Sequence, residues 1–211
     1  MNSDHLLFLT IFWLGYFVIH SILASNGAKQ ACYTRFNQIE PAYRLLYNIV
    51  STLLLIPMVY YIYFVPSKTL IQWHGALAIF ADLLALAAFA GFIYSFKFYQ
   101  GSDFLGLTQF KTKSNTASES FVISPLHRWV RHPWYLFALV IIWTRDMNAH
   151  FLLSACFITA YFYIGSYFEE RKMVQRFGDN YEQYIACVPR IIPSLRKRLS
   201  PSHAANLSQK D

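Results

Sequence analysis

The stretch Leu70–Phe96, LIQWHGALAIFADLLALAAFAGFIYSF, decides the fold class of this chain. It is apolar almost throughout, and Asp82 is its only carboxylate. A helix needs about 20 mostly apolar residues to cross the hydrocarbon core of a membrane. Together with four similar runs, it predicts an all-α integral membrane protein of about five transmembrane helices, followed by a C-terminal amphipathic helix. The expected spans are Leu6–Leu23, Leu45–Val65, Leu70–Phe96, Trp129–Trp143 and Phe151–Phe168.

Composition and length agree with a membrane bundle. The chain is 55% hydrophobic and 14% charged, whereas a soluble domain is about 45–50% apolar and about 25% charged. We expect residues 1–199 to form a single membrane-embedded domain and residues 200–211 to form a disordered tail. Asp4 and the lack of Lys or Arg before the first apolar run favour a retained helix over a cleaved signal peptide. The three cysteines have no zinc-site spacing, so we expect reduced thiols and no metal site.

The basic residues predict the orientation in the membrane. Of the 18 Lys and Arg residues, only Lys68 and Arg145 fall in the second and fourth connections. Because basic loops stay in the cytoplasm, we expect the N-terminus outside and the C-terminus and active site in the cytoplasm. A basic cytoplasmic face attracts anionic membrane lipids. Nucleic acid is not an expected partner, because the basic residues adjoin membrane boundaries and form no separate domain.

Two polar clusters stand at the ends of the fourth and fifth spans. The first cluster is Arg128–Tyr135 and the second is Glu169–Lys172. The connection Thr144–Asn148 is short, so the two spans form a hairpin and both clusters lie at one membrane face. Carboxylates at a helix C-terminus oppose the helix dipole, which favours pairing of the second cluster with cations of the first. An exposed salt-bridge cluster is the alternative.

Proline and glycine predict the local backbone around these clusters. If the fourth helix begins at Ser124-Pro125, Pro133 frees a backbone carbonyl, which membrane proteins tolerate where the backbone lines a cavity. Gly178 is expected to end the fifth helix. A short amphipathic helix should follow, with Tyr181, Tyr184 and Ile185 on one side. The two prolines of Val188–Pro193 exclude a continuous helix there.

These motifs resemble a known superfamily. Arg131-His132-Pro133-Trp134-Tyr135 followed by Glu169-Glu170 is similar to the RHPxY and EE signatures of the isoprenylcysteine carboxyl methyltransferase and phospholipid methyltransferase superfamily. The similarity continues from Phe177-Gly178 to Pro193. Four other segments resemble the methanethiol S-methyltransferase-like (NnrU-like) branch: His20–Ser25, Tyr43–Asn48, Phe104–Gln109 and Trp143–Met147. One position departs from the pattern, because Phe137 stands where the superfamily often has Gly.

The resemblance implies a methyltransferase that uses S-adenosyl-L-methionine, with its site mainly in residues 124–193. It implies catalytic roles for Arg131, His132 and Tyr135. The implied cofactor-binding residues are Arg131, His132, Pro133, Tyr135, Glu169, Glu170, Tyr181 and Tyr184. Their chemistry suits this cofactor, because guanidinium groups bind carboxylates in bidentate geometry and aromatic faces attract a sulfonium cation. The expected acceptor is a small or lipophilic molecule, first a thiol such as methanethiol. A prenylcysteine carboxylate or a phospholipid amine is the alternative.

Two hypotheses from other functional classes, a haem-binding protein and a non-catalytic membrane subunit, stay open. His20 and His132 are expected near the inner membrane face, and His74 and His150 near the outer face, which is a spacing that could ligate b-type haem. Phe137 is also compatible with a non-catalytic membrane subunit. Asp82 is a further candidate functional residue, since carboxylates inside spans are rare, although a shallow position at the end of a long span would explain it as well.

Overall fold

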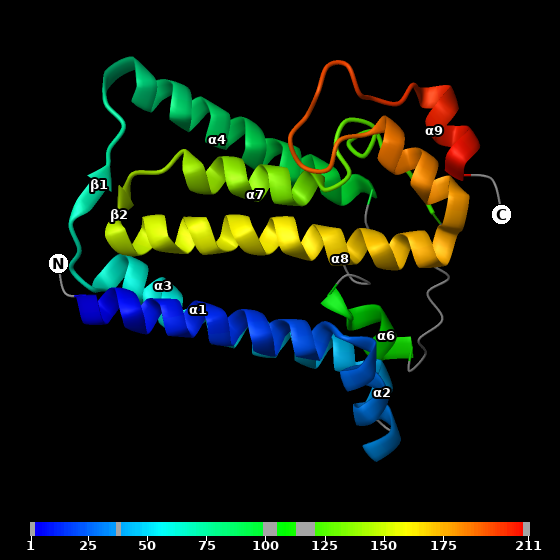
Figure 1. The fold of residues 1–211 in the computed structure, drawn as a ribbon, viewed down its shortest axis with the longest axis horizontal. Coiled ribbons are helices and arrows are strands. Elements are labelled where there is room, and N and C mark those ends of the chain that lie inside the picture. The colour runs from blue at the N-terminus through cyan, green and yellow to red at the C-terminus, as the bar shows by residue number, and fades with distance from the viewer. Residues whose placement is uncertain (1–2, 37–38, 99–104, 113–120, 209–211) are drawn as a thin grey trace. The chain divides into compact units, whose positions relative to one another are not determined.

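The computed structural model describes residues 3–36, 39–98, 105–112 and 121–208, and most of these residues are helical (Figure 1). This confirms the all-α class. The elements in chain order are α1 (Ser3–Ala24), α2 (Asn26–Arg35), the 3-10 turn η1 (Glu40–Ala42), α3 (Tyr43–Phe64), β1 (Thr69–Ile71), α4 (Gly75–Ser95), the 3-10 turn η2 (Phe96–Phe98), α6 (Leu107–Thr112), α7 (Pro133–Trp143), β2 (Met147–Asn148), α8 (Ala149–Cys187) and α9 (Pro201–Ser208).

The protein is a multi-pass membrane protein. Within the described residues, four helices are long and apolar enough to cross a membrane: α1, α3, α4 and α8. The expected fourth span is shorter than predicted, since α7 has 11 residues and rises about 16 Å at 1.5 Å per residue. A hydrocarbon core is about 30 Å thick, so α7 alone does not span it. The third span also begins later, at Gly75, because Thr69–Ile71 form β1.

The chain divides into two compact units. Unit 1 comprises Met1–Gln72, Tyr99–Ala117 and Asp146–Phe157. Unit 2 comprises Trp73–Phe98, Ser118–Arg145 and Ile158–Asp211. The expectation of a single domain over residues 1–199 stays a prediction.

Unit 1 is built on the packing of α1 against α3. The hydroxyl of Tyr43 donates to the carbonyl of Leu23 at 2.7 Å, which ties the start of α3 to the end of α1. The indole of Trp13 donates to the hydroxyl of Ser154 at 2.9 Å and so holds α1 against the first turns of α8. Strands β1 and β2 pair antiparallel and join the second and fourth connections.

Unit 2 is built on the packing of α7 against α4. The indole of Trp134 donates to the hydroxyl of Ser95 at 2.7 Å. Farther along α7, the indole of Trp143 donates to Thr159 at 2.9 Å. Since the start of α7 contacts Glu170 and its end contacts Thr159, α7 and this part of α8 run antiparallel. The predicted hairpin is confirmed.

The C-terminal part of unit 2 differs from the sequence-based expectation. Gly178 interrupts α8 with φ 52°, as predicted. The expected disorder from Ser200 onward is wrong for Pro201–Ser208, which form α9. Two apolar side chains of α9, Ala204 and Leu207, are buried in a cluster with Phe121, Tyr181, Tyr184, Val188 and Leu199. Burial of these side chains stabilises the tail; residues 209–211 lie outside the described chain.

Candidate active site

The backbone before α7 lies against the segment that follows α8. The N–H of Arg131 donates to the carbonyl of Pro189 at 2.9 Å, and the N–H of His132 donates to that of Arg190 at 3.0 Å. Pro133 is the first residue of α7, where its missing N–H costs nothing. The condition for a freed carbonyl, a helix start at Ser124-Pro125, is not met, since residues 125–129 form turns.

Glu170 is the centre of the polar cluster. It is 3% exposed, and three cationic or imidazole side chains converge on it. Arg131 binds it in bidentate geometry, with Nε 2.8 Å from Oε1 and Nη2 3.1 Å from Oε2. His132 Nε2 lies 3.0 Å from Oε1, and Arg190 Nε lies 3.1 Å from Oε2. A carboxylate this deeply buried is tolerated only because it is paired and hydrogen-bonded.

The guanidinium of Arg131 is occupied by the protein itself. Besides Glu170, its Nη1 donates to the carbonyl of Ile185 at 2.9 Å and to that of Val188. Arg131 thus fixes the end of α8 and the following segment against the start of α7. The predicted role of Arg131 in binding a cofactor stays a prediction; the contacts in this structure are to Glu170 and to the backbone.

Glu169 differs sharply from its neighbour. Its side chain is 53% exposed and lies 3.5 Å from His132 Nδ1. The hydroxyl of Tyr135 donates to its Oε2 at 3.2 Å. The rings of His132, Tyr135 and Phe162 stack nearly parallel, with successive centroids 5.1 and 4.5 Å apart. This column holds Glu169 at the surface of the cluster, where it can accept hydrogen bonds from a ligand.

Tyr181 and Tyr184 are buried beside this cluster, and burial together with the nearby Glu170 raises the pKa of Tyr181. They are 4% and 2% exposed and pack around Phe121, with ring centroids 5.4 and 5.6 Å from it. The hydroxyl of Tyr184 donates to the carbonyl of His127 at 2.7 Å. Both tyrosines are core residues that support the segment carrying Arg131 and His132.

A cavity of about 360 Å³ adjoins Glu170. Its volume is at the lower end of the range of ligand sites, about 300–1,000 Å³. The guanidinium groups of Arg171 and Arg190 lie 5.9 and 5.8 Å from the ring centroid of Tyr167, so two cations adjoin one aromatic ring. The cavity is lined by Tyr167, Glu170, Arg171, Val174, Gln175, Ile185 and Arg190.

Sequence reasoning missed most of these lining residues. The signal was the helical spacing of positions 167, 170, 171 and 174, which puts them on the face of α8 that carries Glu170. Arg190 could not be assigned from the sequence, because its approach to Glu170 depends on the turn after Cys187.

His127 lies behind the cluster as a neutral group. Burial, together with the nearby His132, lowers the pKa of His127 to about 4. Its Nδ1 lies 2.7 Å from the hydroxyl of Ser124. At neutral pH it therefore adds no charge next to Arg131 and His132.

Phe137 points to α4. A Cβ built on Gly91 would lie 2.8 Å from Cε1 and Cζ of Phe137, so the phenyl ring occupies the space that Gly91 leaves open. Tyr135 and Phe137 are two residues apart on α7 and so point to nearly opposite sides. The side chain at position 137 is therefore a packing contact between α4 and α7.

The remaining candidates have simpler surroundings. Asp82 pairs with Arg145 at 2.9 Å, and both side chains are substantially exposed. Both ring nitrogens of His132 lie against carboxylates, at 3.0 and 3.5 Å. Because this leaves no nitrogen of His132 directed at an iron, the geometry gives the haem alternative no support, and that alternative stays a prediction.

Comparison with known proteins points in one direction. The chain is 31% identical over 185 residues to methanethiol S-methyltransferase 1 of Bradyrhizobium diazoefficiens. The aligned region covers 83% of this chain and 62% of that protein. It is 29% identical over 193 residues to the methanethiol S-methyltransferase of Crocosphaera subtropica, covering 88% of this chain and 74% of that protein. The chain spans less than two thirds of the length of the first of these relatives. No family model matches it, and no solved structure does.

Proposed function

Because this chain is a relative of the methanethiol S-methyltransferases, we propose that it transfers a methyl group from S-adenosyl-L-methionine to a small apolar thiol. The observation that carries the proposal is the cluster around Glu170 with the cavity beside it. Glu170 is a buried carboxylate held by two arginines and a histidine, so it is not part of an ordinary surface salt bridge. It also lines a cavity large enough for a ligand.

The residues of the cavity fit the cofactor's chemical groups. Arg171 and Arg190 suit the carboxylate of its amino-acid part, since guanidinium groups bind carboxylates well. The Tyr167 ring, which already lies near two cations, suits the sulfonium or the adenine. Exposed Glu169 suits the ribose hydroxyls or the ammonium group. The bound cofactor supplies an activated methyl group on sulfur.

In this proposal the motif residues do not contact the cofactor themselves but position the residues that do. Arg131, His132 and Tyr135 are positioning residues, because their polar atoms hold Glu169, Glu170 and the backbone after α8. Pro133 starts α7 at the position from which His132 and Tyr135 reach their partners. Methyl transfer is an in-line displacement, so a rigid site that orients the reacting atoms supplies most of the catalysis.

A thiol acceptor needs to lose its proton. A free thiol has a pKa near 8.5, so only a few per cent is thiolate at neutral pH. The cations that line the cavity, Arg171 and Arg190, favour the thiolate electrostatically. The proton leaves to solvent, and the thiolate sulfur takes the methyl group.

We also propose that the N-terminus lies outside and that the C-terminus and the site lie in the cytoplasm. The asymmetry of Lys and Arg supports this orientation. Pairing of β1 with β2 puts the second and fourth connections on the same membrane face, as this topology requires.

The test is an acceptor panel. Purified protein in lipid nanodiscs is incubated with methyl-labelled S-adenosylmethionine and, in parallel, with methanethiol and longer thiols, a prenylcysteine and phospholipids. We expect label in the thioethers. Label only in the prenylcysteine ester or in phospholipid would assign the alternative acceptors, and no label in any product would contradict the methyltransferase proposal.

A further inference from the structure

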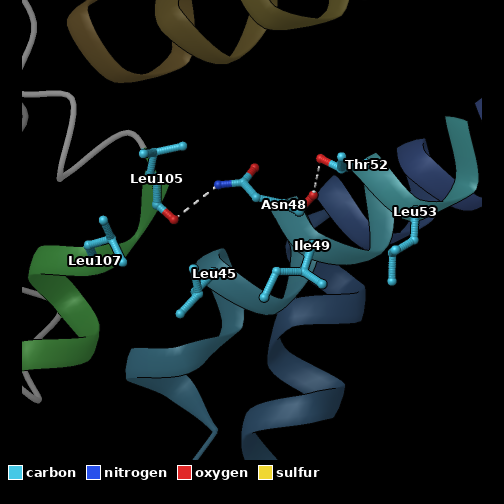
Figure 2. Close-up of a pocket in the computed structure, with 7 residues that line it drawn as sticks. All are labelled: Leu45, Asn48, Ile49, Thr52, Leu53, Leu105 and Leu107. Carbon is cyan, nitrogen blue, oxygen red and sulfur yellow. Dashed lines mark hydrogen bonds between the residues drawn. The ribbon is translucent and has the colours of Figure 1, made fainter. Parts of the chain in front are cut away.

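Exposed apolar side chains are ordinary on the helices of this protein that can cross a membrane, because lipid tails surround such helices. The face of α3 that Figure 2 shows is an example, since Ile49 and Leu53 lie on it with exposed side chains. The loop between α8 and α9 is different, because it is not part of a membrane-spanning helix. It nevertheless carries Leu195, which at 86% is the most exposed large hydrophobic side chain of the described residues, and Ile192, which is 67% exposed.

Hydrogen bonds hold this loop, residues 191–198, at both of its ends. Before the loop, the backbone N–H groups of residues 131–132 donate to the carbonyls of residues 189–190. After the loop, the N–H of Leu199 donates to the carbonyl of Arg128 at 3.0 Å, and Nε of Arg128 donates to the carbonyl of Leu199 at 3.0 Å. The loop is therefore fixed to the segment that precedes α7.

A β-turn inside the loop presents Leu195 at its tip. The N–H of Lys197 donates to the carbonyl of Ser194 at 3.3 Å, so Leu195 and Arg196 are the two central residues of the turn. The N–H of Arg196 also donates to the hydroxyl of Ser194 at 3.3 Å. Exposed apolar side chains that the backbone holds in this way mark a surface that binds a membrane or another protein.

The charges beside the turn favour a membrane. Arg196, Lys197 and Arg198 follow Leu195 directly, and all three side chains are exposed. Within the part of the chain that the structure describes, none of the three forms an ion pair with a carboxylate. The guanidinium of Arg198 lies 4.8 Å from the ring centroid of Trp129, and tryptophan is enriched at membrane interfaces. Apolar side chains flanked by unneutralised cations fit an anionic lipid surface.

The position of the loop along α8 agrees with a membrane surface. The apolar run of α8 ends at Phe168. Arg190 lies beside this turn of α8, with its Nε 3.1 Å from Oε2 of Glu170 and its guanidinium 5.8 Å from the ring centroid of Tyr167. Ile192 follows two residues later, so its Cα lies within about 7 Å of the Cα of Arg190. The loop therefore begins where α8 loses its apolar character, which is the level expected for the membrane surface.

We propose that this loop binds the surface of a membrane that contains anionic lipid. Ile192 and Leu195 enter the interface between headgroups and acyl chains, and the three cations bind the anionic headgroups. Each cation near such a surface gains about 1 kcal/mol, or about fivefold in affinity. All of these residues belong to unit 2, and lipid binding by the loop is independent of the proposed methyl transfer.

The first test measures lipid binding to the full-length protein in detergent by native mass spectrometry, with phosphatidylglycerol and phosphatidylcholine of the same acyl chains. The loop variant removes the three cations: Arg196→Gln/Lys197→Gln/Arg198→Gln. The control removes the same charge from exposed positions elsewhere: Arg35→Gln/Lys111→Gln/Lys172→Gln. We expect the wild type and the control to prefer phosphatidylglycerol, and the loop variant to bind the tightest phosphatidylglycerol at least about tenfold more weakly.

The second test locates the tip of the turn in nanodiscs that contain phosphatidylglycerol. Leu195→Trp adds an indole at the tip, and Ala205→Trp adds one at an exposed position of α9 in the same unit. Quenching by lipids brominated in their acyl chains is measured for each variant and corrected for the signal of the five native tryptophans. We expect the added fluorescence of Leu195→Trp to be quenched more strongly than that of Ala205→Trp.

Three results would overturn the inference. The first is a wild type without preference for phosphatidylglycerol, or an equal loss of that preference in the loop variant and in its control. The second is equal quenching of Leu195→Trp and Ala205→Trp. The third is a blue-shifted indole at position 195 that brominated lipids do not quench, which would mean that protein, such as a second copy of the chain, covers the loop.

Discussion

Replacing Glu170 by glutamine tests whether this carboxylate is the structural centre of unit 2. The substitution keeps the size of the side chain and removes its charge. Its partners are Arg131, His132 and Arg190, and the side chain of Arg131 is itself only 6% exposed. The variant therefore leaves a buried guanidinium without a counter-charge. Removing one partner of a buried ion pair costs about 3–5 kcal/mol.

Glu169→Gln is the matched control, because it is the same chemical change one position earlier. The side chain of Glu169 is 53% exposed, and its contacts are to Tyr135 and His132. Loss of such an exposed interaction costs about 0–1 kcal/mol. We thus expect Glu170→Gln to destabilise the protein by at least about 2 kcal/mol more than Glu169→Gln.

The assay is equilibrium unfolding of both variants in the same detergent, followed by helicity and by tryptophan fluorescence. Glu169→Gln should weaken cofactor binding directly, because Glu169 is the exposed carboxylate that a ligand can reach. Glu170→Gln should affect binding only through the structure of the cluster. Equal free energies of unfolding for Glu169→Gln and Glu170→Gln would refute the assignment of Glu170 as the buried centre.

Three further predictions follow from unit 2. The pKa of His127 is about 4 in the folded protein and 6.5 in the reference state, so the unfolded chain takes up the proton first as the pH falls. The free energy of unfolding should therefore contain the full contribution of His127 above about pH 6.5. That contribution should fall by up to about 3 kcal/mol toward pH 4. Chemical unfolding at a series of pH values should show this loss in the wild type, and His127→Gln should show a shallower one. Gly91→Ala should destabilise the protein by about 1–3 kcal/mol through its clash with Phe137, and adding Phe137→Leu should restore part of that loss in a thermal melt; no rescue would place the strain elsewhere. Leu207→Ala should cost about 2–5 kcal/mol, because Leu207 is 3% exposed, whereas a tail that contributes nothing would leave the melting temperature unchanged.

Much of this architecture could be predicted from the sequence, because hydrophobic runs and charged cluster positions carry the information directly. The long apolar runs predict the positions of α1, α3 and α4 and of the first half of α8, which continues to Cys187 beyond the predicted span. The short polar connection at Thr144 predicts the hairpin, and the hairpin brings His132 and Glu170 together. Gly178 predicts the break in α8, since few other residues adopt a positive φ.

Other features depended on three-dimensional contacts that residue types do not reveal. Residue type makes Arg131 a good carboxylate ligand, but only the folded backbone after Cys187 shows that two carbonyls occupy its Nη1. Tyr181 and Tyr184 are equally suited to a ligand site and to a core by residue type, and only the structure shows that their rings pack around Phe121; their predicted role in cofactor binding stays a prediction. The polar composition of the tail predicts disorder, yet α9 buries two apolar side chains.

The central claim is that unit 2 binds S-adenosylmethionine in the cavity beside Glu170, and titration calorimetry with S-adenosylhomocysteine tests it most directly. The wild type should bind one molecule per chain. Arg171→Ala removes a cavity cation that does not contact Glu170, and it should weaken binding about tenfold, as expected for the loss of a charged partner worth about 1.4 kcal/mol. Lys172→Ala, a cation one residue farther along α8 that does not line the cavity, should bind as the wild type does. No binding by the wild type, or equal affinity of Arg171→Ala and Lys172→Ala, would contradict this account.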